Sequence, residues 1–94
     1  MRFEWDENKN DANIIKHGIS FKLASKVFSD PDRIEYWDGA HSSMLEDRYI
    51  TIGRIAETVI IVVVVYTDRM GIVRMISARR ALKKEEQEYY GNRK

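Results

Sequence analysis

The sequence predicts an α+β domain: one antiparallel-rich sheet with two N-terminal helices on one face and a C-terminal helix. Residues 59–65 are seven consecutive apolar, β-branched residues, which favour a strand that is buried on both faces. A short linker, 67–71, contains Gly71 and leads into a second apolar run, 72–79, as in a β-hairpin. Helical patterns precede and follow this hairpin, so the predicted order is β-α-α-β-β-β-β-α.

Length and composition narrow the class of protein. The 94 residues suit one domain, 1–94, and the absence of cysteine excludes disulfides and thiolate metal sites. The charged N-terminus lacks the apolar centre of a signal peptide, and residues 59–66 are too few to cross a bilayer, which takes about 20. We therefore expect a cytoplasmic protein with no membrane partner.

Charge is unevenly distributed along the chain. Residues 1–47 hold six basic against ten acidic side chains, a net of −4, whereas residues 48–94 hold ten against five, a net of +5. The second half is rich in arginine, whose planar guanidinium group binds phosphate at two points. This asymmetry points weakly to a polyanionic partner, and a solvated sheet edge with ordinary ion pairs explains it equally well.

The first helix follows a short strand at residues 2–5. Asp6 is suited to cap the N-terminus of the helix, which we expect to run to about His17 and to end at Gly18 in a left-handed conformation. Helical spacing predicts that Ala12 and Ile15 point inward.

A second helix should begin after Ser20 and end before Pro31, because proline disfavours helix in the residue before it. Its predicted apolar stripe consists of Phe21, Ala24, Val27 and Phe28.

Two further strands, 32–37 and 48–55, flank a polar loop that starts at residue 38, and a helix is predicted at 81–90. In the strand at 72–79, simple alternation predicts Ser77 and Arg79 on one face of the sheet and Arg74 and Arg80 on the other. The N-terminal helices can cover only one face, and the last helix is short and charged. We therefore expect part of the opposite face to be buried by another chain.

The sequence matches several known functional motifs only poorly. Residues 7–28 could form a helix-turn-helix DNA reader, but the second helix offers few polar side chains, so two helices that cover the sheet explain it better. His41 lies near acidic residues whose spacing matches no metal-ligand motif, and no serine lies in a nucleophile-elbow pattern. We expect neither a metal nor a cofactor.

Arginine and tyrosine side chains on and around the hairpin are better suited to a functional site. Clustered guanidinium groups can hold a scissile phosphate and stabilise the extra charge of its transition state without a metal. The residues of this group are Arg48, Tyr66, Arg69, Arg74, Arg79 and Arg80.

Short motifs follow one another along nearly the whole chain. They comprise residues 3–6, Lys9, Asn13, 16–18, Phe21, Ala24, 27–31, 38–42, Glu46, Arg48, 52–53, 64–67, Arg69 and 76–81. Each motif is weak alone, but their order and spacing together make a specific signal. They resemble the motifs of the BrnT family, which are ribonuclease toxins of bacterial type II toxin–antitoxin systems with a RelE-like fold.

The resemblance implies a cytoplasmic toxin that cleaves RNA and halts translation. Its partner would be a cognate antitoxin with a ribbon-helix-helix DNA-binding domain, so DNA would be bound only through the antitoxin. We expect the assembly to be a homodimer or a heterotetramer. Two positions depart from the family pattern. Leu82 replaces a Thr or Ser that would cap the last helix, at a cost of about 1 kcal/mol, and Glu86 stands where the family tends to have Arg.

The leading hypothesis is a metal-independent endoribonuclease in which a 2′-hydroxyl attacks the adjacent phosphate. Arg79, with Arg48 or Arg69, would stabilise the transition state, and Tyr66 or His41 would move protons. The alternatives are an inactive homologue that acts as a binding module or corepressor, and plain DNA binding through residues 7–28. The candidate RNA-binding residues are Lys16, His17, Arg54, Arg74 and Arg80.

Overall fold

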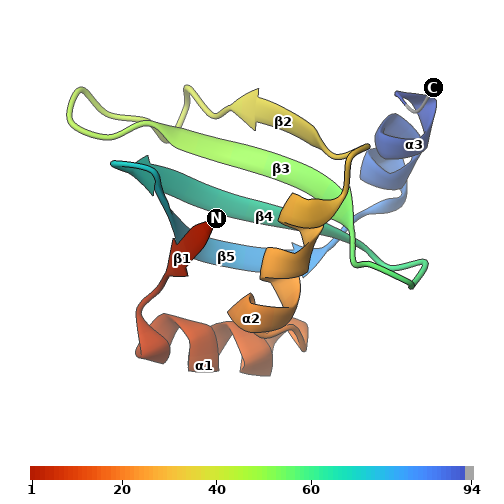
Figure 1. The fold of residues 1–94 in the computed structure, drawn as a ribbon, viewed down its shortest axis with the longest axis horizontal. Helices are drawn as coiled ribbons and strands as arrows, with labels where there is room; N and C mark the ends of the chain where they lie inside the picture. The colour runs from red at the N-terminus through yellow and green to blue at the C-terminus, as the bar shows by residue number, and fades with distance from the viewer. Residues whose placement is uncertain (93–94) are drawn as a thin grey trace.

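The computed structural model describes residues 1–92 and confirms the predicted α+β class and order of elements (Figure 1). A 3₁₀ turn, η1, continues the second helix. The elements are β1 (Arg2–Glu4), α1 (Glu7–His17), α2 (Phe21–Ala24), η1 (Ser25–Ser29), β2 (Ile34–Trp37), β3 (Arg48–Arg54), β4 (Ile61–Arg69), β5 (Ile72–Arg80) and α3 (Lys83–Gly91).

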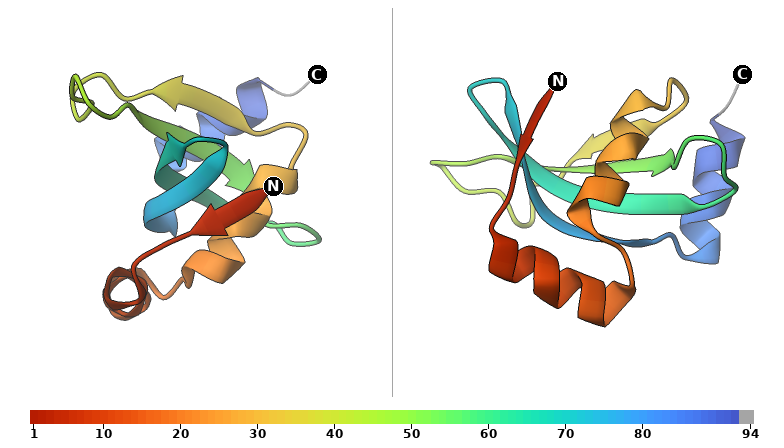
Figure 2. Two further views of the ribbon diagram at one scale, coloured as in Figure 1. Left: turned by 60° about the vertical axis from the view of Figure 1, so that its left-hand side comes forward. Right: turned by 60° about the horizontal axis from the view of Figure 1, so that its bottom comes forward.

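The five strands form one sheet in the order β1-β5-β4-β3-β2, in which β1 runs parallel to β5 and every other pair is antiparallel. The first face of the sheet carries Val62, Val64 and Tyr66 of β4, and the second face carries residues 61, 63, 65 and 67. Figures 1 and 2 show α1 and α2 on one side of the sheet and α3 beside its far end. None of the helices within residues 1–92 is long and apolar enough to span a membrane.

The main core lies between the first face and the N-terminal helices. Phe21, Ala24 and Val27 are fully buried there, which confirms the predicted apolar stripe, and Phe28 packs at its margin. Burial of each large apolar side chain stabilises the fold by about 1.5–3 kcal/mol. The strand residues in this cluster are Val62, Val64, Tyr66, Val73, Met75 and Ala78.

Both predicted ends of α1 are confirmed. Asp6 accepts hydrogen bonds from the backbone N–H groups of residues 8 and 9, and Gly18 takes a φ of 73° and donates to the Ile14 carbonyl. The predicted inward face is wrong, because Ala12 is exposed and Ile15 is 87% exposed. The buried residue of this helix is Asn13.

Asn13 makes three hydrogen bonds, two of which join α1 to the sheet. Its Nδ2 donates to the carbonyls of Ile19 (2.9 Å) and Ala78 (2.8 Å), and its Oδ1 accepts from the Ala78 N–H (3.1 Å). Because β1 pairs with β5 only along residues 72–74, the outer edge of β5 has no neighbouring strand at Ala78. The side-chain amide of Asn13 pairs with this backbone as another strand would.

The second face has its own smaller core beneath α3. Tyr89 is fully buried against Ile52, Ile61 and Val63, and its hydroxyl donates to Asp30 Oδ2 at 2.6 Å. Val63 is only 4% exposed. The prediction that α3 is too small to cover this face is therefore wrong for the half that contains Val63.

The hairpin and the strand after it differ from simple alternation. The turn is only Met70 and Gly71, both with positive φ, because β4 continues to Arg69. Val65 pairs with Ser77 whereas the next residue, Tyr66, pairs with Met75, so residue 76 forms a β-bulge.

The bulge changes which arginines share a face. Arg74 lies opposite Thr67, Arg79 opposite Val63, and Arg80 opposite Val62. Arg74 therefore lies on the second face with Arg79, so the alternation that placed it with Arg80 is wrong.

The N-terminus of α3 has half of a capping box. Leu82 is the N-cap residue and has no side-chain acceptor, as expected from the sequence, but its backbone N–H donates to Glu85 Oε1 at 2.7 Å.

Replacement of Asn13 by leucine should destabilise the protein by about 3 kcal/mol, because it leaves buried backbone groups of Ala78 and Ile19 without partners. Urea unfolding at neutral pH measures the change. The control is Asn8→Leu at an exposed position of the same helix, which should shift stability by no more than about 0.5 kcal/mol. Equal effects of the two substitutions would contradict the role of Asn13.

Tyr89→Phe should lower the free energy of unfolding by about 1–2 kcal/mol at pH 7, since Asp30 loses a buried donor. Burial and the hydrogen bond to Asp30 raise the pKa of Tyr89 to about 12. Its contribution is therefore complete below the ordinary tyrosine value near 10 and is lost as the pH rises through 12. Urea unfolding between pH 9 and pH 12 should be less pH-dependent in Tyr89→Phe than in Tyr36→Phe, a control at an exposed tyrosine.

Candidate functional site

Three arginines lie on the second face of the sheet, beyond the part that α3 covers or at its border. Arg48 of β3 and Arg74 of β5 both lie opposite Thr67 of the central strand, β4. Arg79 lies on the other side of the β-bulge in β5, four residues after Met75. Between the position of Arg48 and Arg74 and the position of Arg79, the half-buried Val65 of β4 pairs with the half-buried Ser77 of β5. The sheet thus presents three guanidinium groups on a single surface.

At the position of Arg48 and Arg74, four residues form a row across four neighbouring strands: Glu4, Arg74, Thr67 and Arg48. Neighbours in such a row have Cβ atoms about 4.5–5.5 Å apart. Arg74 Nη1 lies 3.7 Å from Glu4 Oε1. Within residues 1–92, the Arg48 side chain makes no hydrogen bond or ion pair. This end of the surface therefore has one weakly paired arginine and one unpaired arginine.

Thr67 is the buried polar group of this row. It is 1% exposed, and among residues 1–92 no group hydrogen-bonds to its Oγ1. Sequence reasoning missed it because residue 67 was assigned to the hairpin linker, whereas β4 continues for two residues beyond it. The apolar run at residues 59–65 indicates a strand, but the length of that run does not show at which residue the strand ends.

Arg79 is held in place by Glu85. Its Nη1 and Nη2 donate to the two carboxylate oxygens at 2.7 and 2.8 Å, and Nη1 also approaches the Arg80 carbonyl at 3.3 Å. This hydrogen-bonded pair raises the pKa of Arg79 and lowers the pKa of Glu85. The Arg79 side chain remains 37% exposed, so a fixed guanidinium still reaches solvent. Sequence reasoning did not identify Glu85 as its partner.

The loop before β3 brings His41 to the same end of the sheet as Arg48. His41 Nδ1 lies 2.9 Å from Asp38 Oδ2, and the Asp38 N–H donates to the Arg48 carbonyl at 2.8 Å. Ser42 Oγ in turn accepts from the Arg48 N–H at 2.8 Å. These bonds fix the loop against the start of β3, and the histidine side chain stays exposed.

Arg69 lies at the tip of the hairpin, where its Nε and Nη2 contact Glu46 Oε2 at 3.1 and 3.0 Å. This contact joins the loop before β3 to the hairpin beside an open hollow of about 660 Å³. The hollow is lined by Leu45, Glu46, Asp47, Tyr49, Asp68, Arg69, Met70 and Gly71.

Tyr66 lies on the first face, on the other side of the sheet from Arg48, Arg74 and Arg79. It is buried, packs on Phe28 and Tyr49, and its hydroxyl donates to the Glu35 carboxylate. The structure does not bring it together with the arginines of the second face.

The remaining candidate residues are dispersed. Lys16 is exposed and His17 half-buried at the end of α1, and Arg80 lies on the first face at the end of β5. Arg54 lies at the far end of β3, opposite Ile61 on the second face, at the end where α3 packs. These positions do not form one cluster with the second-face arginines.

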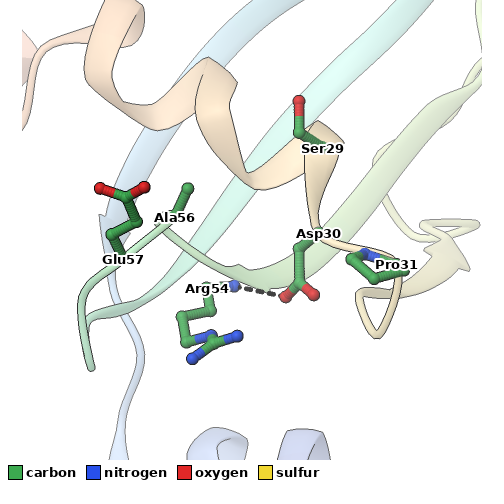
Figure 3. Close-up of a pocket in the computed structure, with 6 residues that line it drawn as sticks. All are labelled: Ser29, Asp30, Pro31, Arg54, Ala56 and Glu57. Atoms are coloured by element: carbon green, nitrogen blue, oxygen red, sulfur yellow. Dashed lines mark hydrogen bonds between the residues drawn. The ribbon is translucent and has the colours of Figure 1, made fainter.

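Arg54 lines a small pocket of about 140 Å³ with Asp30 (Figure 3). Asp30 Oδ2 accepts from the Arg54 N–H at 2.8 Å and from the Tyr89 hydroxyl, and its Oδ1 accepts from the Asp32 N–H. Burial raises the pKa of Asp30, but these hydrogen bonds outweigh burial and lower it overall. The carboxylate is used to join η1, β3 and α3, which indicates a structural role.

The described residues contain no group of three histidine or acidic side chains placed to hold a metal ion. The chemistry that the second face offers is therefore that of guanidinium groups, a hydroxyl and a nearby imidazole, which together suit the binding of phosphate.

Comparison with known proteins agrees with this chemistry. A search of curated proteins finds no significant match to the chain. Residues 5–85 match the family model described as "Ribonuclease toxin, BrnT, of type II toxin-antitoxin system". The matched segment includes Arg48, Thr67, Arg74 and Arg79 and confirms the resemblance found in the sequence. The chain belongs to the BrnT family of ribonuclease toxins.

Proposed function

We propose that this chain is a metal-independent endoribonuclease that inhibits translation and acts on RNA at the second face of its sheet. The observation that supports this site is the β-bulge at residue 76, which places Arg74 on the same face as Arg48 and Arg79. Three guanidinium groups on one surface can bind an RNA backbone and stabilise the additional charge of a pentacoordinate phosphorus.

In this reaction the substrate 2′-oxygen attacks the adjacent phosphorus and the bond to the 5′-oxygen breaks. The products are a 2′,3′-cyclic phosphate and a 5′-hydroxyl. One group accepts the proton of the 2′-hydroxyl and another donates a proton to the leaving 5′-oxygen. Arg79 is the proposed electrostatic stabiliser, because Glu85 fixes two of its nitrogens and leaves part of the side chain exposed.

His41 is the preferred group for proton transfer. Asp38 holds its Nδ1, which leaves Nε2 for substrate, and the loop is joined to the backbone of Arg48. Histidine also has an ordinary pKa close to neutrality. Tyr66 is the weaker candidate, because it is buried on the opposite face.

The other proposed RNA contacts follow from position. Arg74 lies in the same surface as Arg48, and Arg69 lies at the hairpin tip next to it. Lys16, His17, Arg54 and Arg80 lie away from this surface, so they would contact only RNA that extends around the domain.

The type II family implies an antitoxin partner. We propose that the antitoxin has a ribbon-helix-helix DNA-binding domain, and that the pair forms a complex which binds DNA only through the antitoxin. Ile50 and Val65 on the second face are half-buried, and Tyr36 beside them is exposed. An antitoxin segment that packs on these side chains would cover the neighbouring arginines and block RNA.

Induction of the chain alone should arrest growth and fragment cellular RNA, and co-expression of the neighbouring gene should relieve both effects. The purified protein should cleave RNA equally well with and without EDTA, because the proposed mechanism uses no metal. Normal growth with abundant soluble protein would favour an inactive homologue that serves as a corepressor. Cleavage abolished by EDTA and restored by a divalent cation would contradict metal independence.

Arg79→Ala should reduce the rate of RNA cleavage about 100- to 1000-fold, on the scale of a lost transition-state donor, while circular dichroism remains native. Arg79→Lys should recover little activity, since an ammonium group lacks the two-point geometry of guanidinium. Glu85→Gln keeps the arginine and removes the charge of its ion-pair partner, so a smaller loss of activity in this variant measures how much the fixed position of Arg79 contributes. A folded Arg79→Ala variant that cleaves RNA at the wild-type rate would remove Arg79 from the site.

A further inference from the structure

We propose that Arg48, Thr67 and Arg74 form a phosphate-binding subsite on the second face, which holds a phosphodiester group of the RNA strand. This inference rests on the proposed function and adds a site to it, separate from Arg79. Its central group is the Thr67 hydroxyl, and the arginines are the cross-strand neighbours of that hydroxyl on each side.

The hydroxyl of Thr67 indicates that this part of the face binds a ligand. Thr67 is 1% exposed, and no group within residues 1–92 hydrogen-bonds to Oγ1. A buried hydroxyl without a partner destabilises a fold, and valine would fill the same space without that cost. The neighbouring strand shows the usual arrangement: the fully buried Thr51 donates to the Ile34 carbonyl at 2.8 Å and accepts from Arg33 Nη1 at 3.1 Å.

The charges around the hydroxyl favour an anion as the missing partner. The Arg48 side chain makes no polar contact within residues 1–92, and Arg74 has one ion pair, at 3.7 Å, to Glu4. Both guanidinium groups can therefore turn toward a ligand with little loss of existing contacts. An anion bound between them would lie above Thr67, where one tetrahedral phosphate can accept hydrogen bonds from both arginines and the hydroxyl.

An RNA strand suits the surface better than a free phosphate ion. Arg79 lies on the same face opposite Val63, which is four residues from Thr67 along β4, roughly 13 Å away. An extended polyanion can contact both the row that contains Thr67 and the more distant Arg79, whereas a single phosphate ion can occupy only one of these two positions. The subsite would thus hold one phosphate of the strand while Arg79 contacts another.

The decisive variant is Thr67→Val, tested with a short 2′-O-methyl oligonucleotide that cannot be cleaved because its 2′-oxygen carries no proton. Binding measured by fluorescence anisotropy should weaken about tenfold, as for a lost hydrogen bond to a charged group. The urea midpoint should be equal to or higher than that of the wild type, because an unpaired hydroxyl is removed. The matched control, Thr51→Val, should show the reverse: a lower urea midpoint and unchanged binding.

Charge variants test the arginines independently. Arg48→Gln and Arg74→Gln should each reduce the slope of log affinity against log salt by about 0.7, the value for one single-strand phosphate contact. Glu4→Gln should tighten binding, since it removes the carboxylate that competes for Arg74. Inorganic phosphate should displace the oligonucleotide only weakly. Phosphate that binds as tightly as the oligonucleotide would assign a free ion to the site and overturn the inference for RNA.

Wild-type affinity in Thr67→Val, or an equal loss in Thr67→Val and Thr51→Val, would overturn the subsite. In that case cleavage by the wild type would leave the ribonuclease proposal intact. Conversely, a wild type that neither cleaves RNA nor arrests growth, but whose binding depends on Thr67, would contradict the ribonuclease proposal and retain the RNA-binding site.

Discussion

Burial of β4 on both faces is the constraint on which the rest of the structure depends. Val62 and Val63 point to opposite sides of the sheet and are both almost completely buried. The N-terminal helices cover the first side, and the ring of Tyr89 covers the second. Since α3 is short, it covers only one end of the second face. The other end of the second face can therefore carry polar side chains without reducing the apolar core.

The β-bulge in β5 determines which side chains lie at this free end. Without it, Arg74 would point toward the first face, where the aromatic core of Phe28, Tyr49 and Tyr66 lies. The extra residue at position 76 reverses the phase of the strand between Met75 and Ser77, so Met75 and Ala78 both face the main core. One inserted residue thus satisfies the core on one side and collects arginines on the other.

Sequence patterns predicted the elements of this fold well, because local signals determine them. The β-branched run, the caps at Asp6 and Gly18 and the stripe at Phe21 each depend on residues that are neighbours in the chain. Asn13 could not be predicted in this way. Its partner, Ala78, is distant in sequence, and a buried asparagine on an amphipathic helix resembles a solvent-exposed one.

The candidate site was predicted by residue type but not by geometry. Arginines 48, 74 and 79 were identified as one group, but alternation without the bulge separates Arg74 from Arg79. Tyr66 was grouped with them from its sequence neighbourhood, and the strand turns it to the opposite face. A register shift of one residue exchanges the two faces of a strand, and nothing in the local composition of residues 72–80 marks where that shift occurs.

The distribution of charge shows how a chain of nearly neutral net charge can present positive charge on one surface. The formal net charge is only +1, so any attraction for a polyanion depends on where the charges lie. On the second face the acidic partners stand at the margins: Glu4 ends the row beside Arg74, and Glu85 holds Arg79 from the start of α3. Arg48 has no acidic partner among the described residues. Each carboxylate therefore pairs with one arginine at the border of the surface, and the unpaired positive charge of Arg48 lies beside the one buried hydroxyl that has no partner within residues 1–92.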